Sequence, residues 1–285
     1  MVDSTPPVTV PPPADPAPGP KPPPHRYAGR LLTTAALVAT GLVLVLTIGV
    51  DHGGGPAPAP AAEPTLAVEP LKPQPGVAVP RTGLTAPLDR PKVSDQAELD
   101  AWSRRVSVTT RISPRVLAAY GRAEMWMRTQ KPACQLSWVT LAGIGRVEAA
   151  HGKFDPDAVG DSGVASKPII GPVLDGAPGV QAVPDSDGGK LDGDTKWDRA
   201  VGPMQFLPET WKRYAERASG DGGKPDPQNI DDSAFTAARY LCSADDDLST
   251  PVGWWKAVLT FNQSLEYAQD VFSGSDAYAA ASLTG

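Results

Sequence analysis

WVTLAGIGRVEAAHG, residues 138–152, is the stretch that decides the fold. Folded as a helix, it places Leu141, Ile144 and Glu148 on one face, at spacings of three, four and seven residues. Gly152 would end that helix, so Glu148 would lie near its negative C-terminal end. Burial on an apolar face and the helix dipole both favour a protonated carboxyl group. A glutamic acid that is neutral near pH 7 meets the requirement for a general acid.

Glu148 also has a simpler, structural interpretation. It could lie at the margin of the helix and form a salt bridge with Arg146 or Arg122. Structural ion pairs perturb acidic groups as well, so this stretch alone does not distinguish a general acid from a structural glutamate.

The composition argues against two classes of function. The net charge is -6 and the C-terminal part has no cluster of Lys and Arg, so we expect no nucleic-acid binding. Three histidines and two cysteines, without a Cys-x-x-Cys pair, leave little for a soft-metal site. His151 is expected to be a helix-end residue, where a cation suits the helix dipole.

A membrane anchor is predicted at residues 31–50, LLTTAALVATGLVLVLTIGV, which contain no charged residue. A helix of this length spans about 30 Å, the thickness of the hydrocarbon core. Lys21, Arg26 and Arg30 precede it, so the N-terminus is expected in the cytoplasm and the rest of the chain outside. We predict a single pass through the cell membrane. A cleaved signal peptide is the alternative, although its apolar region would normally be shorter.

Two proline-rich segments flank the predicted anchor. Residues 1–30 are dominated by Pro, Ala and Val and are expected to form a disordered cytoplasmic tail. Residues 51–93, rich in Ala, Pro and Gly, are expected to form a semi-stiff linker that holds a domain away from the membrane. The folded domain is then expected to cover residues 94–285.

Helical patterns fill most of this domain, and no strand-like alternation of any length is present. Ser113-Pro114 is a good helix start, and Lys131-Pro132 ends the same helix. Together the patterns predict an all-α domain of roughly six to eight helices. The other expected helices cover residues 95–106, 138–152, 208–217, 231–241, 254–262 and 265–272, the last with a continuation towards residue 281 as an alternative.

Residues 154–198 are the exception, because they are rich in Gly, Pro and Asp and show little periodicity. A segment of this length inside a domain is usually functional or disordered. Its stretch from Asp185 to Gly189 resembles the start of a calcium loop, but no glutamate closes it at the twelfth position. Aspartate is also a common turn residue, so we expect turns here.

Cys134 and Cys242 are the only cysteines in the chain. In a domain outside the cytoplasm, two cysteines are expected to form a disulfide. Closing a loop of about a hundred residues would contribute about 4 kcal/mol in the chain-entropy model. Two buried free thiols are the alternative.

Four segments, taken in order, resemble one family: GIGRVEAAHG (143–152), AVGPMQFLPETW (200–211), DPQNIDDSAFTAARYLC (226–242) and AVLTFNQSLEYAQDVF (257–272). They resemble the membrane-bound lytic transglycosylases of the B type, a branch of the lysozyme-like superfamily. The resemblance covers about residues 112–272, and residues 185–206 look most like the actinobacterial members. It implies a lysozyme-like helical catalytic domain.

The resemblance also implies a reaction, the cleavage of peptidoglycan between N-acetylmuramic acid and N-acetylglucosamine. Glu148 would protonate the glycosidic oxygen, and the 2-acetamido group of the substrate would stabilise the cationic sugar. Glu148 would then take the proton of the C6 hydroxyl, which attacks C1 to give a 1,6-anhydro sugar. No water is consumed, so this chemistry does not require the second carboxylate of ordinary glycosidases.

Substrate-binding residues follow from the same resemblance. Gln205 matches the family's substrate-binding glutamine and Met204 the apolar residue beside it, while Asn262 matches an asparagine that contacts the sugar near the acid. The family usually has tyrosine where this chain has Phe261, and the lost hydroxyl could weaken the positioning of the acetamido group or of Glu148. A serine of the family's site has no clear counterpart before residue 200.

Cofactors and partners are expected as follows. Some relatives carry a calcium loop where this chain has residues 218–229, but Asp221 and Asp226 lack a good first ligand before them. We therefore expect no cofactor and leave calcium as an open alternative. The expected partners are peptidoglycan glycan strands and the cytoplasmic membrane, with other cell-wall enzymes left open.

Three hypotheses for the function result. The first is a membrane-anchored lytic transglycosylase. The second is a hydrolytic muramidase on the same fold, in which water replaces the C6 hydroxyl. The third is a wall-binding scaffold without activity, against which the presence of Glu148, Gln205 and Asn262 argues.

Overall fold

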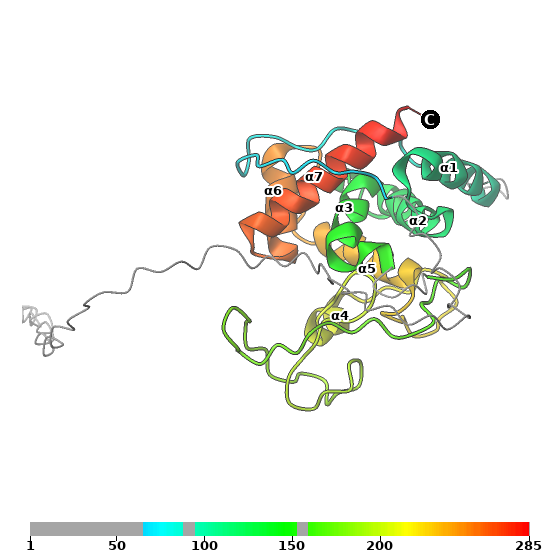
Figure 1. The fold of residues 1–285 in the computed structure, drawn as a ribbon. Coiled ribbons are helices and arrows are strands. Elements are labelled where there is room, and N and C mark those ends of the chain that lie inside the picture. Colours follow the sequence, from blue (N-terminus) through cyan, green and yellow to red (C-terminus); the bar gives the residue numbers. More distant parts are fainter. Residues whose placement is uncertain (1–64, 88–94, 153–158, 285) are drawn as a thin grey trace, which may run out of the picture. The chain divides into compact units, whose positions relative to one another are not determined.

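The structure is a computed structural model that describes residues 65–87, 95–152 and 159–284. The described residues form seven α-helices and contain no strand, as the predicted all-α class requires (Figure 1). The elements are α1 (Asp95–Thr110), α2 (Pro114–Gln130), η1 (Pro132–Cys134), α3 (Trp138–Ala149), η2 (Ala150–Gly152), α4 (Pro208–Tyr214), α5 (Ile230–Leu241), α6 (Pro251–Phe261) and α7 (Leu265–Ser282).

Helix α3 lies at the centre of the domain, with α7, α2 and α5 around it (Figure 1). Its side chains Trp138, Leu141 and Ile144 are fully buried, as the apolar stripe predicts. Close packing against α7 depends on Gly143, because a Cβ atom there would lie 2.3 Å from Ser275 Oγ. Residues 138–149 therefore form the core helix of the domain.

Local signals set the ends of α2 as expected. The Ser113 hydroxyl accepts a hydrogen bond from the Val116 N–H and caps α2, and α2 ends just before Lys131. The cap of α3 is different, because the Ser137 side chain makes no capping hydrogen bond. The buried Glu124 carboxylate on α2 accepts the Trp138 N–H instead, at 2.7 Å. A side chain from one helix thus caps the next.

Residues 65–87, here called the N-terminal strap, run beside α7 against the helical domain (Figure 1). Arg81 forms an ion pair with Asp276 of α7, and the Arg81 N–H donates to the same carboxylate. Three indole N–H groups donate to carbonyl oxygens of the strap: Trp102 and Trp138 to Leu84, and Trp255 to Ala78. The predicted linker includes this segment, but the structure packs it on the helical domain, so the folded unit begins before residue 94.

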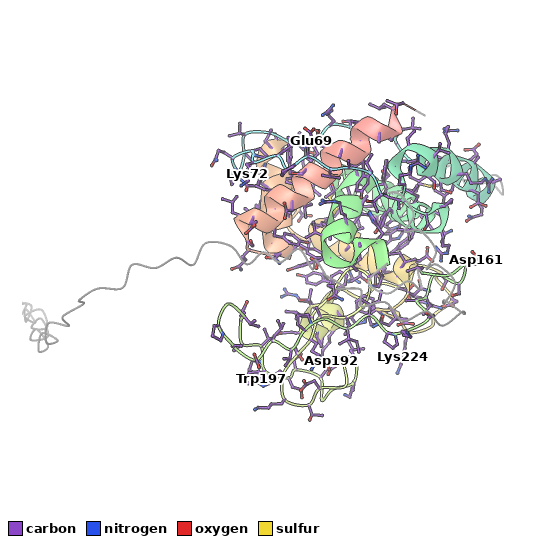
Figure 2. The ribbon with its side chains drawn as sticks, viewed as in Figure 1. Glu69, Lys72, Asp161, Asp192, Trp197 and Lys224 are labelled. Carbon is purple, nitrogen blue, oxygen red and sulfur yellow. A yellow bond between two sulfur atoms is a disulfide. The ribbon has the colours of Figure 1, made fainter. Side chains whose placement is uncertain are left out.

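The segment from residue 159 to 207 is irregular and is held by isolated bridges, such as Ile170–Val201 and Pro184–Trp197. Its aspartates accept backbone N–H groups, as expected of turn residues: Asp185, Asp187, Asp192, Asp194 and Asp198. Figure 2 shows Asp192 and Trp197 of this segment on the side of the domain opposite to Glu69 and Lys72 of the strap.

A disulfide joins Cys134 in η1 to Cys242 at the end of α5, with a Cα–Cα distance of 5.7 Å. It is the pair that the sequence analysis expected, so the free-thiol alternative does not hold in this structure. Within the described ranges no helix is long and apolar enough to cross a membrane. The predicted tail, anchor and first part of the linker (residues 1–64) lie outside the described residues.

Candidate active site

Glu148 lies in the last turn of α3, half-buried near the helix C-terminus. The Tyr267 hydroxyl on α7 donates a hydrogen bond to Glu148 Oε1 at 2.6 Å. Burial raises the pKa of Glu148 to about 7, although this hydrogen bond favours the charged form and lowers the pKa. The carboxyl group is therefore balanced between its acid and base forms near neutral pH.

The structural interpretation of Glu148 finds no support in the described part of the chain, where this carboxylate forms no ion pair. Arg122 binds Asp231 on α5 instead, at 2.9 Å. The electrostatic neighbour of Glu148 is thus the neutral Tyr267 phenol rather than a cation, so desolvation dominates its pKa.

Tyr267 is the site residue that sequence reasoning missed. Its own pKa is raised well above the usual value, first by burial and then by the charge of Glu148, so it stays a donor. The B-type family that the sequence resembles usually has tyrosine where this chain has Phe261. The Phe261 ring packs on Phe206 and Tyr240 at centroid distances of 5.5 and 5.6 Å. The hydroxyl that contacts Glu148 comes from six positions further along the chain.

Met204 and Gln205 lie in a tight turn closed by two backbone hydrogen bonds between Val201 and Phe206, of 2.9 and 3.0 Å. Met204 is fully buried and packs toward Gly145, one turn before Glu148 on α3. Its side chain therefore faces the interior of the domain and not solvent. Gln205 is half-buried and has a positive φ of 46°, a conformation that is rare outside glycine.

Asn262 lies in the short connection between α6 and α7 and is exposed. Its side-chain oxygen accepts the Ser264 N–H at 3.0 Å, and Ser264 caps α7 by accepting the Tyr267 N–H. The residue that contacts Glu148 is thus held by the turn that carries Asn262. Because Phe206 contacts Phe261, the Gln205 turn and the Asn262 turn are also connected.

These contacts define what the site can do chemically. One carboxyl group with a pKa near neutrality can donate a proton and later accept one. No second acidic group among the described residues contributes to its pKa. The arrangement suits a reaction with a single acid-base residue and does not resemble a pair of catalytic carboxylates.

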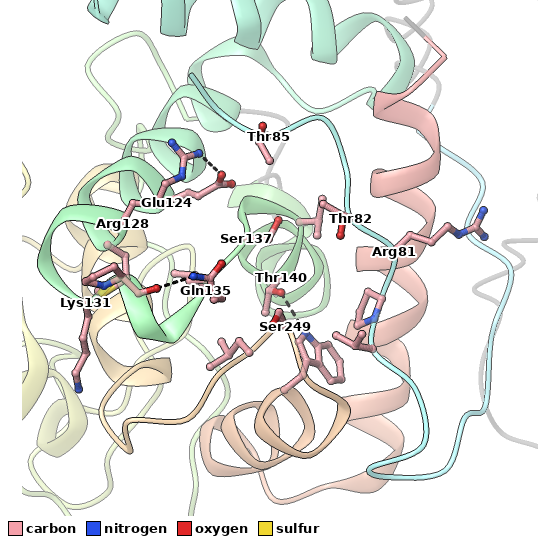
Figure 3. A pocket seen from close by; sticks show the side chains of 18 residues that line it. Arg81, Thr82, Thr85, Glu124, Arg128, Lys131, Gln135, Ser137, Thr140 and Ser249 are labelled. Atoms are coloured by element: carbon pink, nitrogen blue, oxygen red, sulfur yellow. Dashed lines mark hydrogen bonds and ion pairs between the residues drawn. The ribbon is translucent and has the colours of Figure 1, made fainter. Parts of the chain in front are cut away.

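A separate cavity of about 200 Å³ lies at the other end of α3, beneath the N-terminal strap (Figure 3). Glu124 lines it, and burial raises the pKa of this carboxyl group as well. Its two oxygens already accept hydrogen bonds from Arg128 and from the Trp138 N–H. Glu124 therefore joins α2 to α3 and is a structural residue rather than a second candidate acid.

Among the described residues, one group of three carboxylates could hold a metal ion. These are Asp185, Asp187 and Asp198, whose carboxylate oxygens lie within 4.8 Å of one another. Each of them already accepts backbone N–H groups of the turns. These hydrogen bonds are those of turn residues, as expected for this segment.

No protein-family model and no curated protein matches the chain. Among solved structures it is similar to the Escherichia coli lytic transglycosylase Slt35 in complex with bulgecin A, at 15% identity and a TM-score of 0.34, over 64% of this chain and 79% of that one. The same protein in complex with calcium gives 15% identity and a TM-score of 0.33, over 64% and 80%. Similarity at this level establishes neither the fold nor the function of this chain.

Proposed function

We propose that this chain is a peptidoglycan lytic transglycosylase that uses Glu148 as its acid and base. The observation that carries the proposal is the half-buried Glu148 carboxyl group, whose pKa is raised to about 7 and whose only described polar partner is the Tyr267 hydroxyl. The resemblance of four sequence segments to the B-type family indicates the bond that is cleaved, between N-acetylmuramic acid and N-acetylglucosamine.

In the first step Glu148, in its protonated form, donates its proton to the glycosidic oxygen, and the bond between C1 and that oxygen breaks. The 2-acetamido group of the substrate stabilises the positive charge on the sugar. The Glu148 carboxylate formed in this step keeps the hydrogen bond from Tyr267, which favours the charged form.

In the second step this carboxylate accepts the proton of the C6 hydroxyl, whose oxygen forms a bond with C1. Glu148 returns to its protonated form, and the product is a 1,6-anhydro sugar. One proton is given and one is taken, so neither water nor a second carboxylate takes part.

Substrate binding is assigned to groups around the C-terminal half of α3. The exposed amide of Asn262 and the half-buried amide of Gln205 are suited to the polar edges of a sugar. The half-buried Phe261 ring offers an apolar face beside them. Met204 contributes indirectly, by filling the space under the Gln205 turn.

The proposed location is outside the cytoplasm, with residues 31–50 as a single-pass anchor and the helical domain beyond it. The Cys134–Cys242 disulfide supports this proposal, because such bonds persist in oxidising compartments. A cleaved signal peptide would give the same location without the anchor.

The replacement Glu148→Gln tests the assignment, with Glu98→Gln on the exposed face of α1 as the matched control. We expect the first variant to release almost no soluble muropeptide from purified peptidoglycan while keeping its helical circular dichroism spectrum. The control should cleave like the original chain. Equal cleavage by both variants would remove Glu148 from the mechanism, and no cleavage by the folded original chain would favour the scaffold hypothesis.

A further inference from the structure

A second cavity, of about 730 Å³, lies where α2, α4 and α5 end. It does not include Glu148, Gln205 or Asn262. We call it the cationic pocket. It is lined by Trp126, Met127, Gln130, Lys131, Arg213, Tyr214, Glu216, Arg239, Cys242 and Ser243.

The charge of this pocket is positive, although the whole chain has a net charge of -6. Three of its lining residues are cations, and Glu216 is the one acid among them. Arg239 forms an ion pair with Glu216 at 3.0 Å. Lys131 forms an ion pair with Asp245 and donates to the carbonyl oxygen of Cys242 at 2.7 Å. Two of the three cations are thus neutralised within the protein.

Arg213 is the third cation of the pocket, and neither of these ion pairs includes it. Among the described residues no carboxylate pairs with it, and its guanidinium lies 5.3 Å from the centroid of the Tyr214 ring. Its place in the last turn of α4 favours a cation, but a helix end supplies only about half a unit charge and α4 has only seven residues. An exposed guanidinium at the edge of a cavity is therefore available for an anion from outside.

The wall of the cationic pocket is preformed and aromatic. The Trp126 ring stacks on Phe235 at a centroid distance of 4.8 Å, and the Tyr214 ring contacts Tyr240 at 4.6 Å. The Tyr240 hydroxyl donates to the carbonyl oxygen of Thr260, which fixes that ring. Rigid apolar walls with a few polar groups at the rim are the usual construction of a ligand site.

A row of ring contacts connects this pocket to the candidate active site. Tyr214 contacts Tyr240, and Tyr240 contacts Phe261 at 5.6 Å. Phe261 directly precedes Asn262, one of the proposed sugar-binding residues. Only two ring contacts, Phe261–Tyr240 and Tyr240–Tyr214, therefore separate a sugar near Asn262 from the residue next to Arg213.

We propose that the cationic pocket binds the carboxylate groups of the peptide stems that muramic acid units carry. This inference rests on the proposed function and adds a substrate class to it: glycan strands that still bear their peptides. Arg213 would pair with a stem carboxylate, since the guanidinium fork matches carboxylate geometry. Trp126 and Tyr214 would pack against the aliphatic part of the stem.

Arg213→Gln in the full-length chain tests the proposal, with Lys212→Gln as the matched control, because Lys212 is an exposed cation next in sequence that does not line the pocket. Both variants would be assayed on glycan strands with intact stems and on the same strands after an amidase has removed the stems. We expect Arg213→Gln to raise KM about tenfold on intact strands, with kcat unchanged, and to leave stripped strands unaffected. The control should change neither.

An equal effect of Arg213→Gln on both substrates, or no effect on either, would overturn the proposal.

Binding gives a readout that does not need turnover. In the Glu148→Gln background, calorimetry with an isolated stem peptide should show binding that Arg213→Gln weakens by the same factor. If that binding is found while the original chain cleaves nothing, the pocket stands and the proposed reaction fails. If cleavage is found without peptide binding, the reaction stands and the pocket assignment is wrong.

Discussion

The Glu148 carboxyl group and the Tyr267 hydroxyl are the pair on which the proposed chemistry depends. The acid must be protonated to start the reaction, and its pKa is about 7, so kcat/KM should fall as the pH rises through about 7. Tyr267→Phe removes the hydrogen bond that favours the charged form, which should raise the pKa and move this alkaline limb to higher pH. The pH profile of kcat/KM on soluble glycan strands measures both. If the alkaline limb of the kcat/KM profile lies at the same pH in Tyr267→Phe as in the original chain, this assignment is contradicted.

The raised pKa also predicts a stability effect with a definite sign. A carboxyl group whose pKa is higher in the folded state stabilises the fold when it is protonated, and this contribution is lost as the pH rises through the folded pKa. Glu148→Gln should therefore melt at a higher temperature than the original chain at pH 8, and at the same temperature at pH 4. Thermal unfolding followed by circular dichroism tests this. Equal melting temperatures at pH 8 would mean that Glu148 is not desolvated.

Gly171 should control the position of the Gln205 amide. A Cβ atom at Gly171 would lie 2.6 Å from Gln205 Oε1, at the far end of a flexible side chain whose Nε2 donates to the Gly202 carbonyl oxygen. Gly171→Ala should therefore fold but displace the amide. Losing one hydrogen bond to substrate should raise KM about fivefold with little change in kcat. Gly160→Ala is the control, because its nearest neighbour would be 3.9 Å away. Steady-state kinetics that do not separate the two variants would exclude a positioning role for Gly171.

Sequence reasoning succeeded at residues whose signal is local. Glu148 is evident because helix spacing alone puts it on the stripe of Leu141 and Ile144. Tyr267 was missed because its contact with Glu148 spans 119 positions, and nothing in its own neighbourhood marks it. Met204 was assigned from a motif, and only the structure shows that its side chain is buried.

Among the elements, the N-terminal strap carries the clearest prediction about stability. Three indole N–H groups and Arg81 find their partners in the contacts between the strap and the helices. A chain that begins at residue 88 should unfold at a lower urea concentration than one that begins at residue 60, since each lost hydrogen bond costs about 1 kcal/mol. Urea denaturation compares the two chains. Identical midpoints would show that the strap is only a spacer.

The strap also shows why the predicted domain boundary differs from the structure. Its composition of Pro, Ala and Gly is that of a linker. Its hydrogen-bond partners, Trp102, Trp138 and Trp255, lie 18, 54 and 177 positions away along the chain. Helix ends such as Ser113 and Lys131 were predictable because a cap is read from adjacent residues.

For the whole molecule, the Cys134–Cys242 disulfide closes a covalent loop with a sequence separation of 108. In the chain-entropy model such a loop stabilises the fold by about 4–5 kcal/mol, less any strain. The variant with both cysteines changed to serine should therefore melt at a markedly lower temperature while it keeps its helical spectrum at low temperature. Reducing agent should lower the melting temperature of the original chain and leave that of the variant unchanged. An unchanged melting temperature after reduction would contradict the stabilising role.

At this scale the sequence predicted the all-α class, because helical periodicity fills the domain and strand alternation is missing. It did not predict the path of the described residues between 159 and 207. That path depends on bridges such as Ile170–Val201 and on aspartate side chains that accept backbone N–H groups. Such contacts leave no periodic trace in a sequence.

In the proposed mechanism Glu148 regains its proton from the C6 hydroxyl of the sugar and not from water. Mass spectrometry of the muropeptides released from purified peptidoglycan by the full-length chain tests it most directly. The account predicts products lighter than hydrolytic ones by one water molecule, with no such products from Glu148→Gln. Products of hydrolytic mass would contradict the transglycosylase mechanism and make the protein a muramidase.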